Sequence, residues 1–437
     1  MARALPRLNC TATAIMASAT SATKVTVLVK SQFQLKNKNA RVWYLEVRVG
    51  SVGPLLLLSP GSARPSDCSW LSKQLWLEYF LIYSVAEKIL HTGREKGAAM
   101  VSTLGKNSEF AEVNIYNEGS LLMALRDVDL VVHAAGPFQQ APKCTVLEAA
   151  IETKTAYIDV CDDTIYSQRA KSFKDRAIAA NIPAITTGGI YPGVSNVMAA
   201  ELVRVARNES KGEPERLRIG LLCMLLLFLD CAAFFGDNCR RFASGFGGED
   251  EEQSMIHGEE ITLEPYSGML SVDFGKGIGR KDVFLLNLPE VRSAREVLGV
   301  PTVSARFGTA PFFWNWGMVT MQRLFPAEYL RDRSKVQQLV QLFDPVVRAF
   351  DGIAGERVSM RVDLECTDGR NTVGIFSHRR LSVSVGTAIA AFVLAVLEGA
   401  TQPGVWFPEE PEGIAIEARE VLLKRASQGT INFVMNK

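Results

Sequence analysis

Short apolar runs alternate with amphipathic stretches between residues 108 and 209. The run at residues 128–135 is rich in valine and stops at Gly136 and Pro137. Such a run is typical of a strand that is buried on both faces of a parallel sheet. Further strands are predicted at residues 111–116, 156–160 and 182–187, and helices at residues 118–126, 144–152, 165–180 and 195–208. Strand and helix alternate with short connections, which predicts an α/β fold with a doubly wound parallel sheet and a ligand site at the carboxyl ends of its strands.

The pattern changes from about residue 259. Strands separated by turn signals are predicted at residues 261–274, 282–288, 302–307, 358–366 and 372–376. They indicate a second, α+β domain with a largely antiparallel sheet. The apolar run at residues 386–397 is too short to cross a bilayer comfortably, so we expect a buried core helix there, which opens a C-terminal helical segment that packs back.

Two stretches follow neither pattern: residues 33–90 and residues 216–258. Within the second, residues 219–236 are apolar and interrupted only by Asp230. A membrane span is the alternative interpretation of this run, but a lone carboxylate is costly in hydrocarbon, so we expect no stable membrane insertion.

The N-terminal 26 residues have the composition of an organelle transit peptide. They are rich in Ala, Ser and Thr, their only charged side chains are Arg3, Arg7 and Lys24, and no acidic residue precedes Glu46. This composition differs from a secretory signal, which has a continuous apolar centre. We expect import into a plastid, with the mitochondrion as the alternative; a disordered tail has a similar composition.

Bulk composition excludes several classes of partner. The chain has 437 residues and a formal net charge of +1, so no overall field attracts nucleic acid. The eight cysteines form no CxxC pair and have no zinc-ligand spacing, so no metal site is expected. A small-molecule substrate is the expected partner, and a homodimer is compatible with this interpretation.

We therefore divide the chain into five parts, with residues 33–90 as an aberrant stretch inside the second. The parts are a transit-like segment (1–26), a Rossmann-like domain (27–215), an atypical insert (216–258), an α+β domain for substrate binding or dimerisation (259–385) and C-terminal helices (386–437).

Three motifs carry a resemblance to a known family. VDLVVHAAGPF at residues 128–138, AYIDVCDD at 156–163 and GGIYPGVSN at 188–196 resemble the saccharopine dehydrogenase-like family, and the plant plastid members of unassigned substrate most of all. The similarity covers roughly residues 93–218 and 259–437. It implies an oxidoreductase that uses NADP or NAD and passes a hydride to or from a small carbonyl, imine or secondary amine.

The resemblance implies a cofactor site at the end of the valine-rich strand. Glycine there lets the backbone approach the cofactor, and phenylalanine offers an apolar face to its nicotinamide half; a plain strand-ending turn is the alternative. The predicted cofactor-binding residues are Ala134, Ala135, Gly136, Pro137 and Phe138, with Arg94 as a candidate for reading a ribose phosphate.

Catalytic candidates follow the next two predicted strands. Asp159, Asp162 and Tyr191 can orient a substrate or move a proton. Helix capping is the alternative role for the aspartates, as it is for Asn196. His133 lies inside the apolar strand and is expected to be a core histidine with satisfied hydrogen bonds.

The chain departs from the family at its N-terminal part and again at residues 221–255. A first strand is predicted at residues 24–29, but no glycine occurs between Met1 and Gly50, whereas the family has a glycine-rich loop that meets the pyrophosphate. A second strand that would end in a ribose-reading group is also missing. The alternative function is therefore a catalytically impaired Rossmann-like scaffold that no longer binds cofactor.

Overall fold

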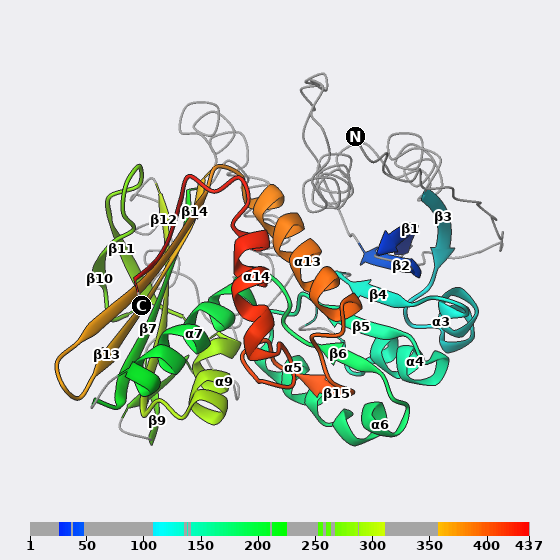
Figure 1. Ribbon diagram of the computed structural model, residues 1–437, viewed down its shortest axis with the longest axis horizontal. Helices are drawn as coiled ribbons and strands as arrows, with labels where there is room; N and C mark the ends of the chain where they lie inside the picture. The colour runs from blue at the N-terminus through cyan, green and yellow to red at the C-terminus, as the bar shows by residue number, and fades with distance from the viewer. Residues whose placement is uncertain are drawn as a thin grey trace, which may run out of the picture.

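The computed structural model is built from two β-sheets with helices packed on both (Figure 1). It describes residues 26–35, 38–47, 108–134, 138, 141–209, 212–224, 252–256, 259–263, 267–286, 288–310 and 357–436. The seven-stranded sheet has the order β15-β6-β5-β4-β2-β1-β3, and the nine-stranded sheet contains the path β10-β11-β12-β7-β13-β14-β16.

The first sheet contains the predicted parallel core. β4 (Leu130–His133), β5 (Ala156–Asp159), β6 (Pro183–Ile185) and β15 (Gly404–Trp406) run parallel to one another. Leu130 and Val132 of β4 enter the core beneath the C-terminal helix α13 (Leu381–Leu397), whereas Val131 enters the core on the opposite face. The strand reads as continuously apolar because helices cover both faces. The predicted doubly wound α/β fold is confirmed.

The N-terminal strands differ from the prediction. β1 (Thr26–Leu35) and β2 (Lys38–Val47) form an antiparallel hairpin, and β1 also pairs antiparallel with β3 (Ser108–Val113). β2 lies beside β4 and runs parallel to it. Residues 24–29 therefore do not begin a strand, loop and helix unit: the position next to β4 is taken by the second strand of the hairpin.

The helices of the first domain agree with the prediction except at one point. α3 (Glu118–Leu125) and α4 (Thr145–Thr153) are single helices, but the expected helix at 165–180 is divided into α5 (Thr164–Lys171) and α6 (Lys174–Ala179). Ser172 donates its hydroxyl hydrogen to the carbonyl of Arg169 at 2.7 Å, and the Phe173 amide bonds to the carbonyl three residues back. This local hydrogen bonding competes with the helical ladder and ends α5.

The second sheet is largely antiparallel, as predicted. Its strands are β7 (Pro214–Met224), β10 (Leu270–Asp273), β11 (Arg280–Leu285), β12 (Thr302–Ala310), β13 (Arg357–Cys366), β14 (Asn371–His378) and β16 (Asn432–Asn436), with β8 (Glu252–Ile256) and β9 (Glu259–Leu263) attached through β12. Among the strands of this sheet that the structure describes, β7 and β12 are the one pair that runs parallel. The continuous strand expected at 261–274 is two strands, since β9 pairs with β8 and β10 pairs with β11.

Residues 216–224, expected to begin an atypical insert, lie in the central strand β7. Leu217, Ile219 and Leu221 point into the core, where α7 (Val194–Glu209) and α9 (Pro289–Leu298) also pack. Burial in the sheet accounts for the apolar composition of this part of the run. The rest of the run lies outside the described residues, and within the described ranges no helix is long and apolar enough to cross a membrane.

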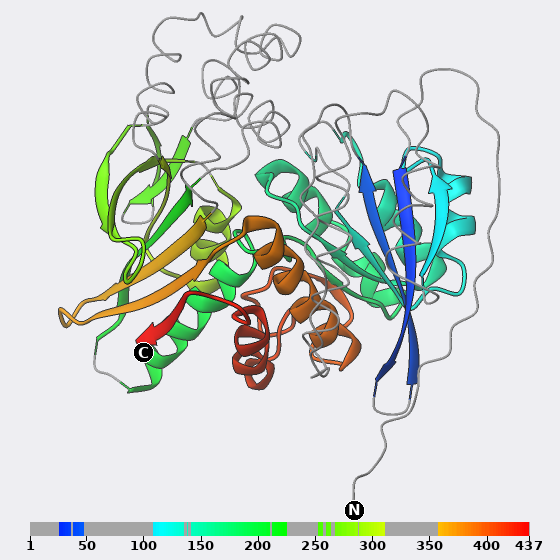
Figure 2. The same ribbon diagram turned by 90° about the horizontal axis from the view of Figure 1, so that it is seen from above.

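The C-terminal segment connects the two sheets. After α13 it contributes β15 to the first sheet, then α14 (Ile416–Ala426), and then β16 to the second sheet. Seen from above, α13 and α14 lie between the sheets (Figure 2). One continuous core contains Val132 and Ile158 from the first sheet and Ile219 and Val362 from the second. The two domains are therefore packed through a shared apolar interior.

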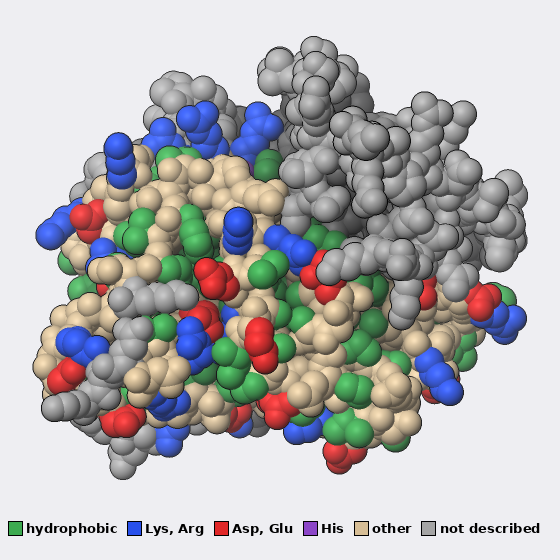
Figure 3. Space-filling view, in the orientation of Figure 1, with side chains coloured by type: hydrophobic (Ala, Val, Ile, Leu, Met, Phe, Trp, Pro, Cys, Tyr) green, Lys and Arg blue, Asp and Glu red, His purple; other side chains and the backbone are tan. Residues whose placement is uncertain are grey.

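The surface agrees with the small net charge. On the face drawn in Figure 3, acidic and basic side chains are interspersed over the lower half, while Lys and Arg gather along the upper left edge. The side chains described on this face form no large field of one sign.

Candidate active site at the carboxyl edge of the first sheet

The carboxyl ends of β4, β5 and β6 meet at one edge of the sheet. The register pairs His133 with Asp159 and Ile158 with Ile185. Because the strands are parallel, the residues that follow each of them converge on this edge. Ala134 and Phe138 are therefore brought together with residues 159–163 and 186–196.

Asp159 is the centre of this edge, and it is completely buried. Its Oδ1 accepts hydrogen bonds from the Cys161 amide at 3.0 Å, the Thr187 amide at 2.8 Å and the Thr186 hydroxyl at 3.1 Å. Its Oδ2 accepts one from the Tyr157 hydroxyl at 3.0 Å. Burial raises the pKa of Asp159 to about 6, although these hydrogen bonds act in the opposite direction. The carboxylate thus joins the loops after β5 and β6, and its oxygens are occupied by protein donors.

An aromatic cluster lies beneath Asp159. The Nδ1 atom of His133 is 3.1 Å from the Tyr157 hydroxyl and 3.5 Å from the Tyr166 hydroxyl. The ring of Phe138 meets the rings of His133 and Tyr166 edge-on, with centroids 5.0 Å away in each case. His133 is 4% exposed, which confirms a core histidine, but its hydrogen bonds are not all satisfied as expected, because the buried Nε2 has no hydrogen-bond partner. Burial raises the pKa of Tyr157 and Tyr166 well above the ordinary value, which keeps both phenols protonated.

The loop after β6 is tightly constrained. Thr187 has a φ of 65°, a left-handed conformation that β-branched residues rarely adopt. Its side-chain oxygen is buried and has no hydrogen-bond partner. A Cβ on Gly188 would lie 2.9 Å from Cγ2 of Ile158, and one on Gly193 would lie 2.1 Å from the carbonyl oxygen of Gly189. Backbone strain of this kind concentrates at functional sites, and no sequence signal marked Thr187.

The remaining predicted residues divide between described and undescribed parts of the chain. Asp162 and Tyr191 are half-buried, and Tyr191 packs on the edge of the main core. The neighbouring Asp163 caps α5, because its Oδ1 accepts from the Tyr166 amide at 2.7 Å. Ala134 is half-buried at the end of β4. The other four predicted cofactor-binding residues lie outside the described residues; they are Arg94, Ala135, Gly136 and Pro137.

A second buried polar cluster lies at the N-terminus of α7. Asn196 accepts a hydrogen bond from the Gly193 amide at 2.8 Å and donates to Oε1 of Glu409 at 2.8 Å. It lies inside the first turn of α7 and bonds back to the residue before the helix, so it is not the N-cap residue that the capping alternative predicted. Ser195 donates to Oε1 of Glu290 at 3.1 Å. Burial raises the pKa of Glu409, against hydrogen bonds from Ser293 and Asn196 that lower it. Sequence reasoning missed the two glutamates, because they lie 95 and 213 residues from their partners along the chain.

Metal ligands are not gathered anywhere in the described part of the chain: no group of three or more His, Cys, Asp or Glu side chains there can hold an ion. The described cysteines Cys144, Cys161, Cys223 and Cys366 are buried free thiols. Burial raises the pKa of Cys144 to about 12, with Asp159 acting in the same direction, so this thiol is not a nucleophile.

Comparison with known proteins supports the resemblance. Residues 86–185 match the family described as the saccharopine dehydrogenase NADP binding domain. The carboxynorspermidine synthase of Vibrio cholerae is 24% identical over 252 residues, which is 53% of this chain and 55% of that protein. The apo saccharopine dehydrogenase (L-Glu forming) of Saccharomyces cerevisiae has a similar fold, with a TM-score of 0.55, 12% identity, and coverage of 84% of this chain and 97% of that one.

The fold consists of a Rossmann-like domain and a second, sheet-rich domain, and the match at residues 86–185 supports the class of nicotinamide-dependent oxidoreductases. Within the chain, residues 86–185 are similar to the saccharopine dehydrogenase NADP binding domain, and this match covers less than half of the chain. The matched part is about half the length of the Vibrio cholerae relative.

One described polar group at this edge fits the cofactor that the matching domain implies: the buried Thr187 hydroxyl has no hydrogen-bond partner in the protein. Gly188 is required by the packing of the chain itself, because a Cβ there would lie 2.9 Å from Cγ2 of Ile158 and 3.2 Å from the carbonyl oxygen of Asp159. The cofactor supplies or accepts the hydride when bound. What this chain contributes at the described positions is orientation: Asp159 holds the amide of Thr187, and with it the loop, in place.

Proposed function

We propose that the chain is an NAD(P)-dependent oxidoreductase acting on a small molecule with a carbonyl, imine or secondary-amine group. One observation supports this above the others: the fully buried Asp159 holds a strained, glycine-containing loop at the carboxyl edge of a parallel sheet. That edge is where doubly wound folds bind dinucleotides and their substrates. A scaffold with no ligand gains nothing from maintaining a left-handed threonine and a buried, unpartnered hydroxyl there.

Roles for individual residues follow from burial. Asp159 positions the loop and has no oxygen available for a substrate. Tyr191 and Asp162 are half-buried, so they are the candidates for orienting the substrate or transferring a proton. The stretch from Ala134 to Phe138 is assigned to the cofactor, with Phe138 as a buried support rather than an exposed face. Arg94 is assigned to the ribose phosphate.

The substrate class is taken from the named relatives. One is a carboxynorspermidine synthase and another is a saccharopine dehydrogenase. We take carboxynorspermidine and saccharopine as the first compounds to assay in the oxidative direction. NADP is the first cofactor to offer, because the matching family is described by that cofactor, and NAD is the second. Plastid import and a homodimer belong to the same proposal.

The competing function is a scaffold that has lost cofactor binding. It is favoured by the N-terminal hairpin: β1 passes into β2 after two residues, so no helix follows the first strand. In a dinucleotide-binding fold the helix after the first strand presents its N-terminus to the pyrophosphate. Loss of that helix weakens the affinity for the cofactor and leaves the second domain unaffected.

An activity assay tests the proposal directly. The purified full-length chain is mixed with each amine substrate and NADP, and absorbance of the reduced nicotinamide at 340 nm is followed. Formation of reduced cofactor that depends on both substrate and protein supports the oxidoreductase. If neither substrate gives turnover but the cofactor binds, the reaction class stands and the substrate assignment is wrong. If neither cofactor binds, the scaffold function replaces the proposal.

A further inference from the structure

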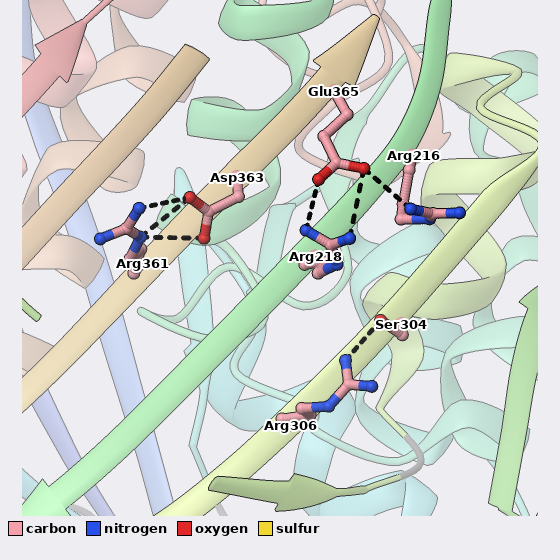
Figure 4. Close-up of polar contacts among 7 residues, drawn as sticks. All are labelled: Arg216, Arg218, Ser304, Arg306, Arg361, Asp363 and Glu365. Atoms are coloured by element: carbon pink, nitrogen blue, oxygen red, sulfur yellow. Dashed lines mark hydrogen bonds and ion pairs between the residues drawn. The ribbon is translucent and has the colours of Figure 1, made fainter. Parts of the chain in front are cut away.

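Part of one face of the second sheet carries charged side chains, while Leu222, further along β7 on the same face, packs in a small apolar cluster with Val272, Phe274 and Val283. Side chains alternate along each strand, so every second residue points to the same face. On β7, Leu217 and Ile219 enter the core shared with α7 and α9, and on β13 Val362 and Leu364 do the same. The residues between them, Arg216, Arg218, Arg361, Asp363 and Glu365, point to the opposite face, together with Ser304 and Arg306 of β12 (Figure 4).

The strand register makes these side chains neighbours. Arg218 of β7 is paired with Ser304 of β12 on one side and with Asp363 of β13 on the other. The next position on this face is Gly220, which is paired with Arg306 and Arg361. Three adjacent strands therefore bring four guanidinium groups and two carboxylates onto one surface.

Both carboxylates are already paired with arginines of this face. Glu365 accepts from Arg218 at 2.7 and 3.2 Å and from Arg216 at 2.9 Å. Partial burial opposes ionisation of Glu365, but these two arginines lower its pKa below the ordinary value. Asp363 accepts from Nε and Nη2 of Arg361 at 2.9 and 2.7 Å.

Of these four arginines, Arg306 is the one that is not paired with a carboxylate in the described part of the chain. Its Nη1 donates to the Ser304 hydroxyl oxygen at 2.8 Å and its Nε to the carbonyl of Gly268 at 3.2 Å. Both acceptors are neutral. Partial burial, and then the positive charge of Arg218, lower the pKa of Arg306. A half-desolvated guanidinium beside another cation is unfavourable unless an anion joins them.

The free donors suit an oxyanion. Arg306 keeps both N–H groups of Nη2, and the Ser304 hydroxyl, which accepts from Arg306, still has its own hydrogen to donate. Arg216 keeps the N–H groups of Nη2. Guanidinium groups bind carboxylate and phosphate oxygens through paired hydrogen bonds.

We propose that Arg306, with Ser304, Arg218 and Arg216, forms a binding site for the carboxylate or phosphate group of a small molecule. The flanking Asp363 and Glu365 disfavour a polyanion such as nucleic acid, because extended phosphate backbones need a continuous run of cations. This face is the side of the second sheet that points away from the main core and α7, and the same core contains Val132 and Ile158 of the first sheet. The site is therefore separate from the strand-end edge of the first sheet and suits a ligand that is not the redox substrate.

Calorimetric titration of the full chain at low ionic strength tests the proposal. Inorganic phosphate is the probe in one arm and succinate in the other, and the tighter of the two identifies the preferred oxyanion. We expect saturable binding in at least one arm, weakened about tenfold or more in Arg306→Gln, as the loss of a charge-assisted contact implies. Arg370→Gln is the matched control, since Arg370 is paired with Asp368 in a turn of the same sheet and its loss should leave binding unchanged.

Thermal unfolding gives a second measurement that does not depend on calorimetric signal. Bound anion stabilises the folded chain, so the preferred anion should raise the Tm of the unsubstituted chain and of Arg370→Gln but not of Arg306→Gln. Absence of saturable binding in both arms, or equal binding by Arg306→Gln, overturns the proposal. So does a change from dimer to monomer in Arg306→Gln without anion binding, because the face would then be a contact between copies of the chain.

Discussion

Replacing Asp159 with asparagine should change how stability depends on pH. The side chain is completely buried and its pKa is raised from 3.8 to about 6, mainly by that burial. A carboxyl group with a raised pKa binds its proton more tightly in the folded state, so stability falls as pH rises between the two values. Since one pKa unit corresponds to about 1.36 kcal/mol, ionised Asp159 lowers the free energy of unfolding by about 3 kcal/mol at neutral pH relative to strongly acidic pH.

Asparagine removes this dependence with little change in shape. Its oxygen still accepts from the amides of Cys161 and Thr187, and its NH2 group can donate to the Tyr157 hydroxyl, which then donates to Nδ1 of His133. Urea unfolding at pH 4.5 and 7.5, followed by circular dichroism, measures the difference. Between pH 4.5 and 7.5, ionisation of Asp159 should lower the free energy of unfolding of the unsubstituted chain by about 2 of the 3 kcal/mol. Asp159→Asn should not show this loss, so its free energy of unfolding should rise by about 2 kcal/mol relative to that of the unsubstituted chain over the same interval.

The exposed Asp175 in the first turn of α6 provides the control. Asp175→Asn should follow the unsubstituted chain within about 0.5 kcal/mol at both pH values, as surface substitutions usually do. If Asp159→Asn also follows the unsubstituted chain, the carboxylate is not the buried, pH-sensitive centre described here. If the variant loses stability equally at both pH values, hydrogen-bond geometry rather than charge dominates at this position.

Two further substitutions test the packing around the site. Gly193→Ala should destabilise the chain by about 3 kcal/mol or more, because its Cβ would overlap the backbone of Gly189. Gly279 also has a positive φ but no neighbouring atom within 4 Å, so Gly279→Ala should cost only about 1 kcal/mol. Equal losses for the two variants in urea unfolding would show that the turn at Gly193 relaxes freely. Trp406→Ala should cost about 3–5 kcal/mol, because this buried ring joins β15 to the first sheet and contacts Lys174 at 4.2 Å. Trp406→Phe should recover part of that loss, and an unchanged Tm in the alanine variant would refute the role of β15 in connecting the domains.

Much of the fold could be predicted from local pattern. The valine-rich β4, the helices α3 and α4, and the apolar α13 are marked by runs whose length and periodicity allow one interpretation. The hairpin of β1 and β2 could not be predicted in the same way, because strand propensity does not say which partner a strand will pair with, or in which direction. The division of α5 from α6 depends on one hydroxyl–carbonyl hydrogen bond at Ser172, which periodicity does not record.

The candidate site was predicted by motif and then refined by burial. The motif AYIDVCDD contains Asp159, Asp162 and Asp163, and only the structure separates them into a buried network centre, a half-buried side chain and a helix cap. Thr187 could not be identified from its residue type, because what distinguishes it is a left-handed backbone conformation and a buried hydroxyl with no hydrogen-bond partner. Glu409 depends on contacts formed only after the C-terminal segment has folded back across both domains.

The central claim is that this chain binds a nicotinamide dinucleotide at the carboxyl edge of its first sheet. Titration of the purified full-length chain with NADPH and with NADH, followed by fluorescence of the reduced nicotinamide, tests it most directly. The account predicts saturable binding of at least one of them in the micromolar range, and competition by the oxidised form. A chain that unfolds cooperatively in urea but shows no saturable binding of either up to millimolar concentration would contradict the account and establish the scaffold in its place.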